Sequence, residues 1–198
     1  MTPRLPTIQT TSHSEQLTQL PTIQEIFEGV ESIAKTEGLL AILNHEPKPE
    51  WVKEHPIIKD WKYLPIGTVE YLLKKVFKRY SIEVLKTGLL LNAVEVTVRI
   101  HYLDPATGEM MYHDGVGAQE LQTMRDTGAL KLDMSNVNRG AVQMALPIAK
   151  TLAIKDACDH FGRLFGADLN RKDLLKYEPD MKIIKMSNKE KLAASNGN

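Results

Sequence analysis

A stretch in the middle of the chain alternates strictly between apolar and polar side chains, and this pattern constrains the fold more than any other feature. The apolar members are Val94, Val96, Val98, Ile100 and Tyr102, and single polar or charged residues separate them. Because successive side chains of a β-strand point to opposite faces, the pattern predicts a strand with one apolar and one polar face. The apolar face needs another layer to cover it.

Turn-forming residues on both sides of this stretch predict neighbouring strands. Ser81–Lys86 is predicted to be a strand that ends in a turn at Thr87-Gly88. Asp104–Gly108 has the composition of a second turn, with a proline and a glycine, and Glu109–Val116 is predicted to be the third strand. The glycines from Gly115 onward are expected to leave the sheet. The centre of the chain is therefore predicted to be an antiparallel meander of three to four strands.

Helical spacing of apolar residues predicts three helices around the meander. The first opens with the capping-box pair Thr22 and Glu25 and ends near Gly38, and a second covers residues 69–80. The longest covers residues 141–166, with Pro147 starting or kinking it. Its apolar side is broad enough to cover a sheet. We therefore expect an α+β fold in which a three- to four-stranded meander packs against a long helix, with an additional N-terminal helix.

The chain has 198 residues, of which 42% are hydrophobic, enough for one ordinary core. Residues 1–21 are rich in Thr, Gln, Ser and Pro, which predicts a disordered arm. Residues 22–180 are predicted to form the single domain, and 181–198 a flexible tail. Between the strands and the long helix, residues 120–139 have no sustained period and are predicted to form a long loop.

Cysteine usage and hydropathy bear on the compartment. The single cysteine, Cys158, cannot form an intramolecular disulfide, which fits a reducing compartment. The first residues contain no apolar run of signal-peptide length, and no segment approaches the roughly 20 apolar residues that a membrane span requires. We therefore expect a cytoplasmic protein without a membrane partner.

Charge is balanced over the whole chain but not locally. There are 25 Lys and Arg against 25 Asp and Glu, so no global field attracts polyanions. Between Lys59 and Lys86, however, seven basic residues stand against three acidic ones. A polyanion site would have to use such a local concentration of cations.

The sequence favours a non-enzymatic protein without cofactor or metal. It contains no GxxxxGK[ST] phosphate-binding loop, and its carboxylates are scattered. A metal-dependent nuclease remains an alternative, because His101 and His113 could face each other across the hairpin and Asp114 follows. No third ligand has helpful spacing, so two ordinary histidines on the polar face are favoured over a metal site.

Four stretches of the chain carry a resemblance to a known family: Tyr63–Phe77, Val96–Arg99, Tyr112–Gly117 and Ala149–Asp173. Together they resemble the DNA-binding domain of the Rad-fifty-two family and its phage single-strand annealing relatives. The most specific part is Asp156 with the later Arg-Leu-Phe-Gly sequence at 163–166. The resemblance covers roughly residues 60 to 175.

The resemblance implies a homo-oligomeric ring or helical filament that binds single-stranded DNA by its backbone and leaves the bases free to pair. It implies annealing of complementary strands without nucleotide hydrolysis, in phage or prophage recombination. A host single-strand-binding protein or a phage exonuclease would be a further partner. The alternative that stays open is an oligomeric structural or recruitment module, acting through the Thr/Gln-rich arm and without annealing activity.

The chain departs from the family pattern where the eukaryotic members carry two consecutive basic residues, since Asp159 and His160 stand there. In the helix before the strands, Thr68 stands where the family has a basic residue, and Arg79 stands where the family has an aromatic residue. Only Arg99 and Arg163 are therefore carried over directly. The DNA-binding candidates are therefore Lys74, Lys78, Arg79, Arg99, Lys150, Lys155, His160 and Arg163.

These candidates also have ordinary structural interpretations. The lysines of residues 74–78 could be a plain solvated helix face. Arg163 could form an ion pair with Asp159, four residues before it.

Overall fold

The computed structural model describes residues 23–56, 58–124 and 134–173, together with Glu178, Asp180, Lys182 and Lys185. The predicted arm and nearly all of the predicted tail lie outside the described residues. The elements in chain order are α1 (Ile23–Leu43), the 3-10 helix η1 (Pro49–Trp51), β1 (Lys53–Glu54), β2 (Lys62–Tyr63), α2 (Ile66–Val76), β3 (Tyr80–Leu90), β4 (Ala93–Leu103), β5 (Met110–Glu120), η2 (Met134–Asn136), α3 (Ala141–Asp159) and η3 (Arg163–Phe165).

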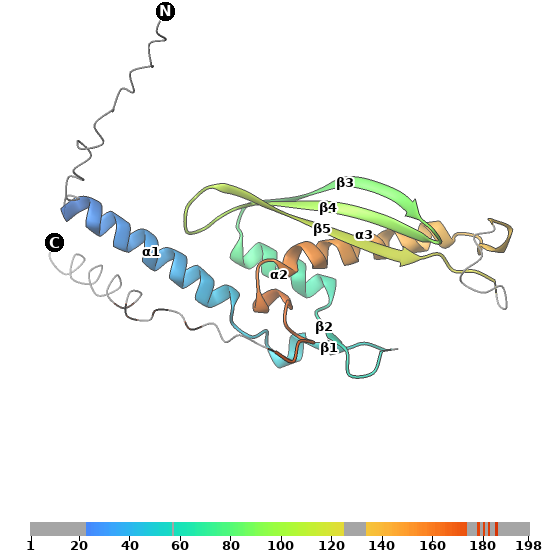
Figure 1. The fold of residues 1–198 in the computed structure, drawn as a ribbon, viewed down its shortest axis with the longest axis horizontal. Coiled ribbons are helices and arrows are strands. Elements are labelled where there is room, and N and C mark those ends of the chain that lie inside the picture. Colours follow the sequence, from blue (N-terminus) through green and yellow to red (C-terminus); the bar gives the residue numbers. More distant parts are fainter. Residues whose placement is uncertain are drawn as a thin grey trace, which may run out of the picture.

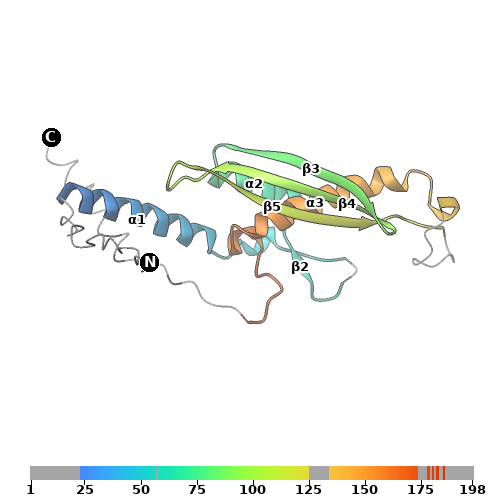
Figure 2. The same ribbon diagram turned by 45° about the horizontal axis from the view of Figure 1, so that its top comes forward.

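The protein has the expected α+β fold. Strands β3, β4 and β5 form an antiparallel meander in that order, and α3 packs against β4 and β5. Figures 1 and 2 show α2 and α3 on the same side of the sheet, while α1 extends away from it. The second, two-stranded sheet of β1 and β2 lies in a stretch where no strands were expected.

The alternation in β4 produces the core as predicted. Val96, Val98 and Ile100 are fully buried on the face that α3 covers, and the residues between them lie on the opposite, outer face. An aromatic cluster closes one end of this core, where the Phe77 ring lies 4.7 Å from Tyr102 and 4.5 Å from Phe161. This cluster connects the end of α2, the sheet and the segment after α3.

The helix α3 lies directly on two glycines of β5. A Cβ added at Gly115 would be 2.3 Å from the Ala153 carbonyl oxygen and from the Ala157 nitrogen. At Gly117 it would be 2.3 Å from the Ala149 carbonyl oxygen. The prediction that the chain leaves the sheet at these glycines is wrong, because β5 continues to Glu120 and the glycines allow the helix backbone to approach it.

The first hairpin turn is also later than predicted. Strand β3 continues through Thr87-Gly88 to Leu90, and the chain reverses at Leu91, which has a φ of 55°, and Asn92. A β-bulge between Val84 and Lys86 shifts the register within β3. Gly88, which suggested the turn, therefore lies inside strand β3, and Leu91 adopts the left-handed conformation in the actual turn.

Several helix ends differ from the prediction. Helix α2 is predicted at 69–80 but covers Ile66–Val76, and Tyr80 is the first residue of β3. Helix α1 continues past Gly38 to Leu43, where Leu43 is buried in the core. Helix α3 contains Pro147 and ends at Asp159, seven residues before the predicted end at Gly166. Gly162, with a φ of 116°, interrupts the helical path before the short η3 begins. No helix among the described residues is long and apolar enough to cross a membrane.

The contact between β5 and α3 predicts a large effect of one methyl group. Gly115→Ala should lower the free energy of unfolding by about 3 kcal/mol or more, because the added Cβ meets rigid backbone atoms. Gly88→Ala is the matched control within the same sheet, since nothing lies within 4 Å of its Cβ position. Urea unfolding of both variants measures the difference. Equal midpoints for the two variants would contradict this packing.

Candidate nucleic-acid interface

The eight predicted residues do not line one groove. Arg99 lies on the outer face of the sheet, whereas Lys74, Lys78 and Arg79 belong to α2 and the turn after it, on the helical side. The remaining four lie on α3 or just after it: Lys150, Lys155, His160 and Arg163. These groups differ in exposure and in partners, and this decides which of them can contact a polyanion.

Exposed cations lie on the last turn of α2 and directly after it. Its apolar stripe of Val69, Leu72 and Leu73 is buried, which turns the opposite face to solvent. We define the α2 stripe as Lys74, Lys75, Lys78 and Arg79. All four side chains are exposed, and none forms an ion pair with another described residue. Their charges are therefore available to a ligand.

Two aromatic side chains lie beside the α2 stripe. Trp51 of η1 and Tyr71 of α2 meet edge to face, with ring centroids 6.2 Å apart. The Lys48 amine lies 5.2 Å from the Trp51 ring centroid, and the Lys75 amine 5.6 Å from that of Tyr71. We call these four residues the cation–aromatic patch. The four-residue spacing of Tyr71 and Lys75 on a helix could have predicted their contact. Nothing in the sequence predicts that Trp51 lies beside them.

Arg99 is already engaged on the outer face. Its guanidinium donates two hydrogen bonds to the Asp114 carboxylate, at 2.7 and 2.8 Å, and lies 4.1 Å from the Tyr112 ring centroid. The hydrogen bonds and charge of Asp114 raise the pKa of Arg99, and Arg99 lowers the pKa of Asp114. A phosphate would have to compete with this bidentate pair.

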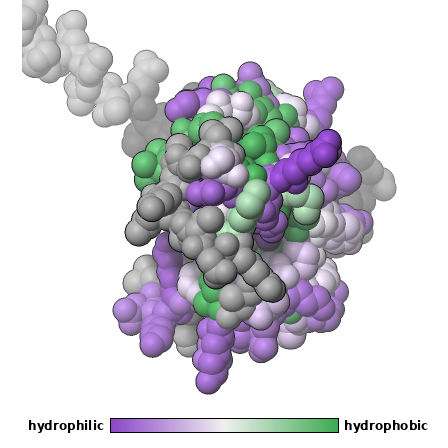
Figure 3. Space-filling model, turned by 90° about the vertical axis from the view of Figure 1, so that its right-hand side faces the viewer, coloured by the Kyte–Doolittle hydropathy of each residue, from purple (hydrophilic) through white to green (hydrophobic). Residues whose placement is uncertain are grey.

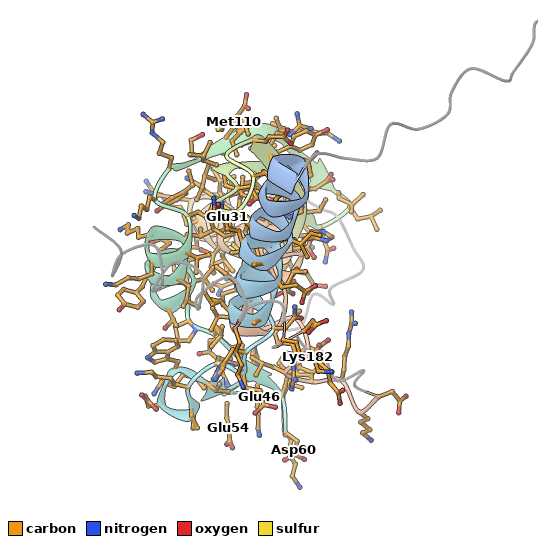
Figure 4. The ribbon with its side chains drawn as sticks, turned by 90° about the vertical axis from the view of Figure 1, so that its left-hand side faces the viewer. Glu31, Glu46, Glu54, Asp60, Met110 and Lys182 are labelled. Atoms are coloured by element: carbon orange, nitrogen blue, oxygen red, sulfur yellow. The ribbon has the colours of Figure 1, made fainter. Side chains whose placement is uncertain are left out.

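Arg163 is also paired, but not with the expected residue. Its Nη2 donates a 2.6 Å hydrogen bond to Glu46 Oε1, and its Nε lies 4.0 Å from Asp168 Oδ2. The side chain is only 17% exposed, at one wall of a cleft of about 490 Å³. Figure 4 shows the labelled Glu46 and Glu54 at this end of the molecule, far from Met110 on the sheet. The alternative ion pair with Asp159 does not form.

Lys155 is partly buried next to β2, and the exposed Asp159 follows it on α3. The Lys155 amine lies 4.8 Å from the Tyr63 ring centroid, and desolvation lowers its pKa. Desolvation, followed by the charge of Asp156, raises the pKa of Asp159 to about 6. Lys155 therefore presents less of its charge to solvent than the α2 stripe does. Lys150 is exposed on α3.

The two histidines considered for a metal site lie on opposite faces of the sheet. His101 pairs with Glu83 on the outer face at 3.0 Å, whereas His113 points inward and contacts the Tyr102 hydroxyl at 3.1 Å. The β4–β5 register places His101 opposite Tyr112, so the two histidines do not face each other. The favoured interpretation, two histidines on the polar face, is wrong for His113. In the part of the chain that the structure describes, no three His, Cys, Asp or Glu side chains are grouped for a metal ion.

His160 is exposed directly after α3, beside the inner-face His113. Its ring lies 5.3 Å from that of His113, which in turn lies 4.9 Å from Phe161.

No protein-family model matches this sequence, and no curated protein matches it either.

The environment of His113 predicts a pH-dependent stability. Desolvation and the charge of His160 lower the pKa of His113 below 6.5, while Asp114 opposes them. The unfolded chain therefore takes up this proton more readily, so stability should fall as the pH drops below 6.5. His113→Gln should flatten the dependence below pH 6.5 in thermal unfolding.

His101→Gln, on the opposite face, leaves His113 in place and should keep this dependence. An unchanged slope in His113→Gln would show that another group causes it.

Proposed function

We propose that this protein binds single-stranded DNA and anneals complementary strands without nucleotide hydrolysis. The observation that supports the proposal most strongly is the α2 stripe, four exposed cations that form no ion pair with another described residue. Binding of a phosphate backbone needs cations that are free to replace its counterions. The resemblance of residues 60–175 to single-strand annealing proteins supports the same function, and it suggests recombination of phage DNA in a bacterial cytoplasm.

The proposal ranks the predicted contacts by their accessibility. Lys74, Lys78 and Arg79 act as primary phosphate contacts, with Lys150 as an accessible addition. Arg99 and Arg163 contribute only where a phosphate displaces Asp114 or Glu46, their present partners. Lys155 and His160 rank lower, because Lys155 is partly buried against Tyr63 and the exposed His160 ring lies against His113.

Self-association is the second part of the proposal. Large apolar side chains remain exposed at the end of the molecule where the β3–β4 hairpin meets the start of α3, namely Leu89, Leu90, Leu91, Val142 and Met144. Figure 3 looks at this end and shows apolar atoms among hydrophilic ones. Both outer strands of the meander, β3 and β5, also have an edge that no described strand pairs. Such features favour contacts between copies in a homo-oligomeric ring or filament.

Neutralising the α2 stripe tests the DNA contact. The variant Lys74→Gln with Lys78→Gln and Arg79→Gln should weaken binding of a labelled single strand, because phosphate contacts are lost. The slope of log affinity against log salt should fall by about 0.7 for each contact removed. Fluorescence anisotropy over a series of salt concentrations measures both effects.

Lys86→Gln is a control on β3, outside the stripe, and should keep the wild-type slope. In the same experiment, wild-type protein should accelerate pairing of complementary oligonucleotides without ATP. Binding without acceleration would favour the recruitment module over the annealing protein, and an unchanged slope in the triple variant would remove α2 as the site.

Polar substitution of the hairpin tests self-association. Leu89 and Leu91 are 63% and 80% exposed, so replacing both by Ser should leave the fold intact. We expect smaller particles in analytical ultracentrifugation, because apolar area between copies is lost. Met110→Ser is the control and should keep the particle size, because Met110 is 62% exposed at the start of β5, at the end of the sheet opposite the β3–β4 hairpin. Identical sedimentation of wild type and the double variant would exclude this surface.

A further inference from the structure

The cation–aromatic patch has the components of a site for a flat ligand. Trp51 packs partly against the core, which fixes its ring, while Tyr71 is 48% exposed. The edge-to-face contact between the two rings holds them in one arrangement. An immobilised aromatic pair at the surface loses little conformational entropy when another ring stacks on it.

Charge around the two rings restricts what this ligand can be. The amines of Lys48 and Lys75 stand at 5.2 and 5.6 Å from the ring centroids, so an organic cation would be repelled. Glu50 and Glu70 are the acidic neighbours in sequence, but the lysines at 48, 74, 75 and 78 outnumber them. A ligand with a flat group on a negatively charged backbone could stack on the rings through the flat group and bind the amines through its charge.

We propose that the cation–aromatic patch stacks unpaired bases of a single-stranded nucleic acid whose phosphates contact the α2 stripe. Base–aromatic stacking needs a free base face, which a duplex does not offer, so the patch selects single strands. This inference rests on the proposed function and assigns its site of base contact to Trp51 and Tyr71.

The chain offers an internal comparison, because its two tryptophans are Trp51 and Trp61. Trp61 is 48% exposed, as Tyr71 is, but within the described residues the Trp61 ring has no aromatic or cationic partner. Trp61→Phe leaves Trp51 as the sole indole reporter, and Trp51→Phe leaves Trp61. Each variant is titrated with an oligothymidylate and with an abasic oligonucleotide of equal length.

We expect oligothymidylate to quench Trp51 fluorescence strongly and the abasic oligonucleotide, which keeps its phosphates, to quench it little. Trp61 should respond weakly to both. Tyr71→Ala should weaken oligothymidylate affinity at least about fivefold while affecting the abasic strand much less. Circular dichroism of each variant shows whether it is folded, and an oligouridylate titration distinguishes RNA from DNA as the preferred strand.

The outcomes separate the two proposals. If labelled oligothymidylate does not bind wild-type protein, the proposed function itself fails. If it binds but leaves Trp51 fluorescence unchanged, or if the abasic strand quenches equally, DNA binding stands and base stacking at this patch is overturned. A Tyr71→Ala variant that is folded and binds both strands as wild type does would overturn it as well.

Discussion

The close approach of α3 to β5 is the constraint on which the rest of the structure depends. Gly115 and Gly117 leave no side chain between the strand and the helix, and the helix presents alanines, such as Ala153 and Ala157, at the contact. Backbone atoms of α3 therefore occupy the space that side chains would fill in ordinary helix–sheet packing. Any added group at this interface would move the whole helix, because α3 is the layer that covers the apolar face of β4.

The position of α3 determines which surface α2 presents. Phe77, directly after α2, packs against Phe161 from the segment after α3 and against Tyr102 from β4, so three segments share one aromatic cluster. The buried side chains of residues 69–73 attach α2 to the same core. With its apolar side fixed in this way, the rotation of α2 is determined, and the basic side chains of its last turn must point to solvent. The cationic surface thus follows from the packing of the core.

Periodicity predicted the fold class because it reports burial directly, and β4 is the clearest example. Glycines predicted the ends of strands less reliably. Gly88 suggested a turn but lies inside β3, and Gly115 suggested the end of the sheet but lies where α3 contacts β5. Only the tertiary structure reveals these two positions. Helical spacing predicts the exposure of Lys74 and Lys75 in the α2 stripe, whereas Lys78 and Arg79 lie beyond the end of the helix at Val76. The pairing of Arg163 with Glu46 could not, because these residues are 117 positions apart and meet only through the fold. The same holds for Trp51, which lies in a stretch without any periodic pattern.

A neutral chain can carry a polyanion site because pairing, rather than number, decides which charges are available. Arg99 and Arg163 are the residues that the family resemblance carries over directly, yet both are bound to carboxylates of this chain. Their partners differ in accessibility, since the Glu46 side chain is 73% exposed and that of Asp114 is 42% exposed. An incoming phosphate would therefore displace Glu46 at a lower desolvation cost than it would break the bidentate contact to Asp114. The α2 stripe requires no such exchange, which is why our proposal assigns the primary phosphate contacts to it.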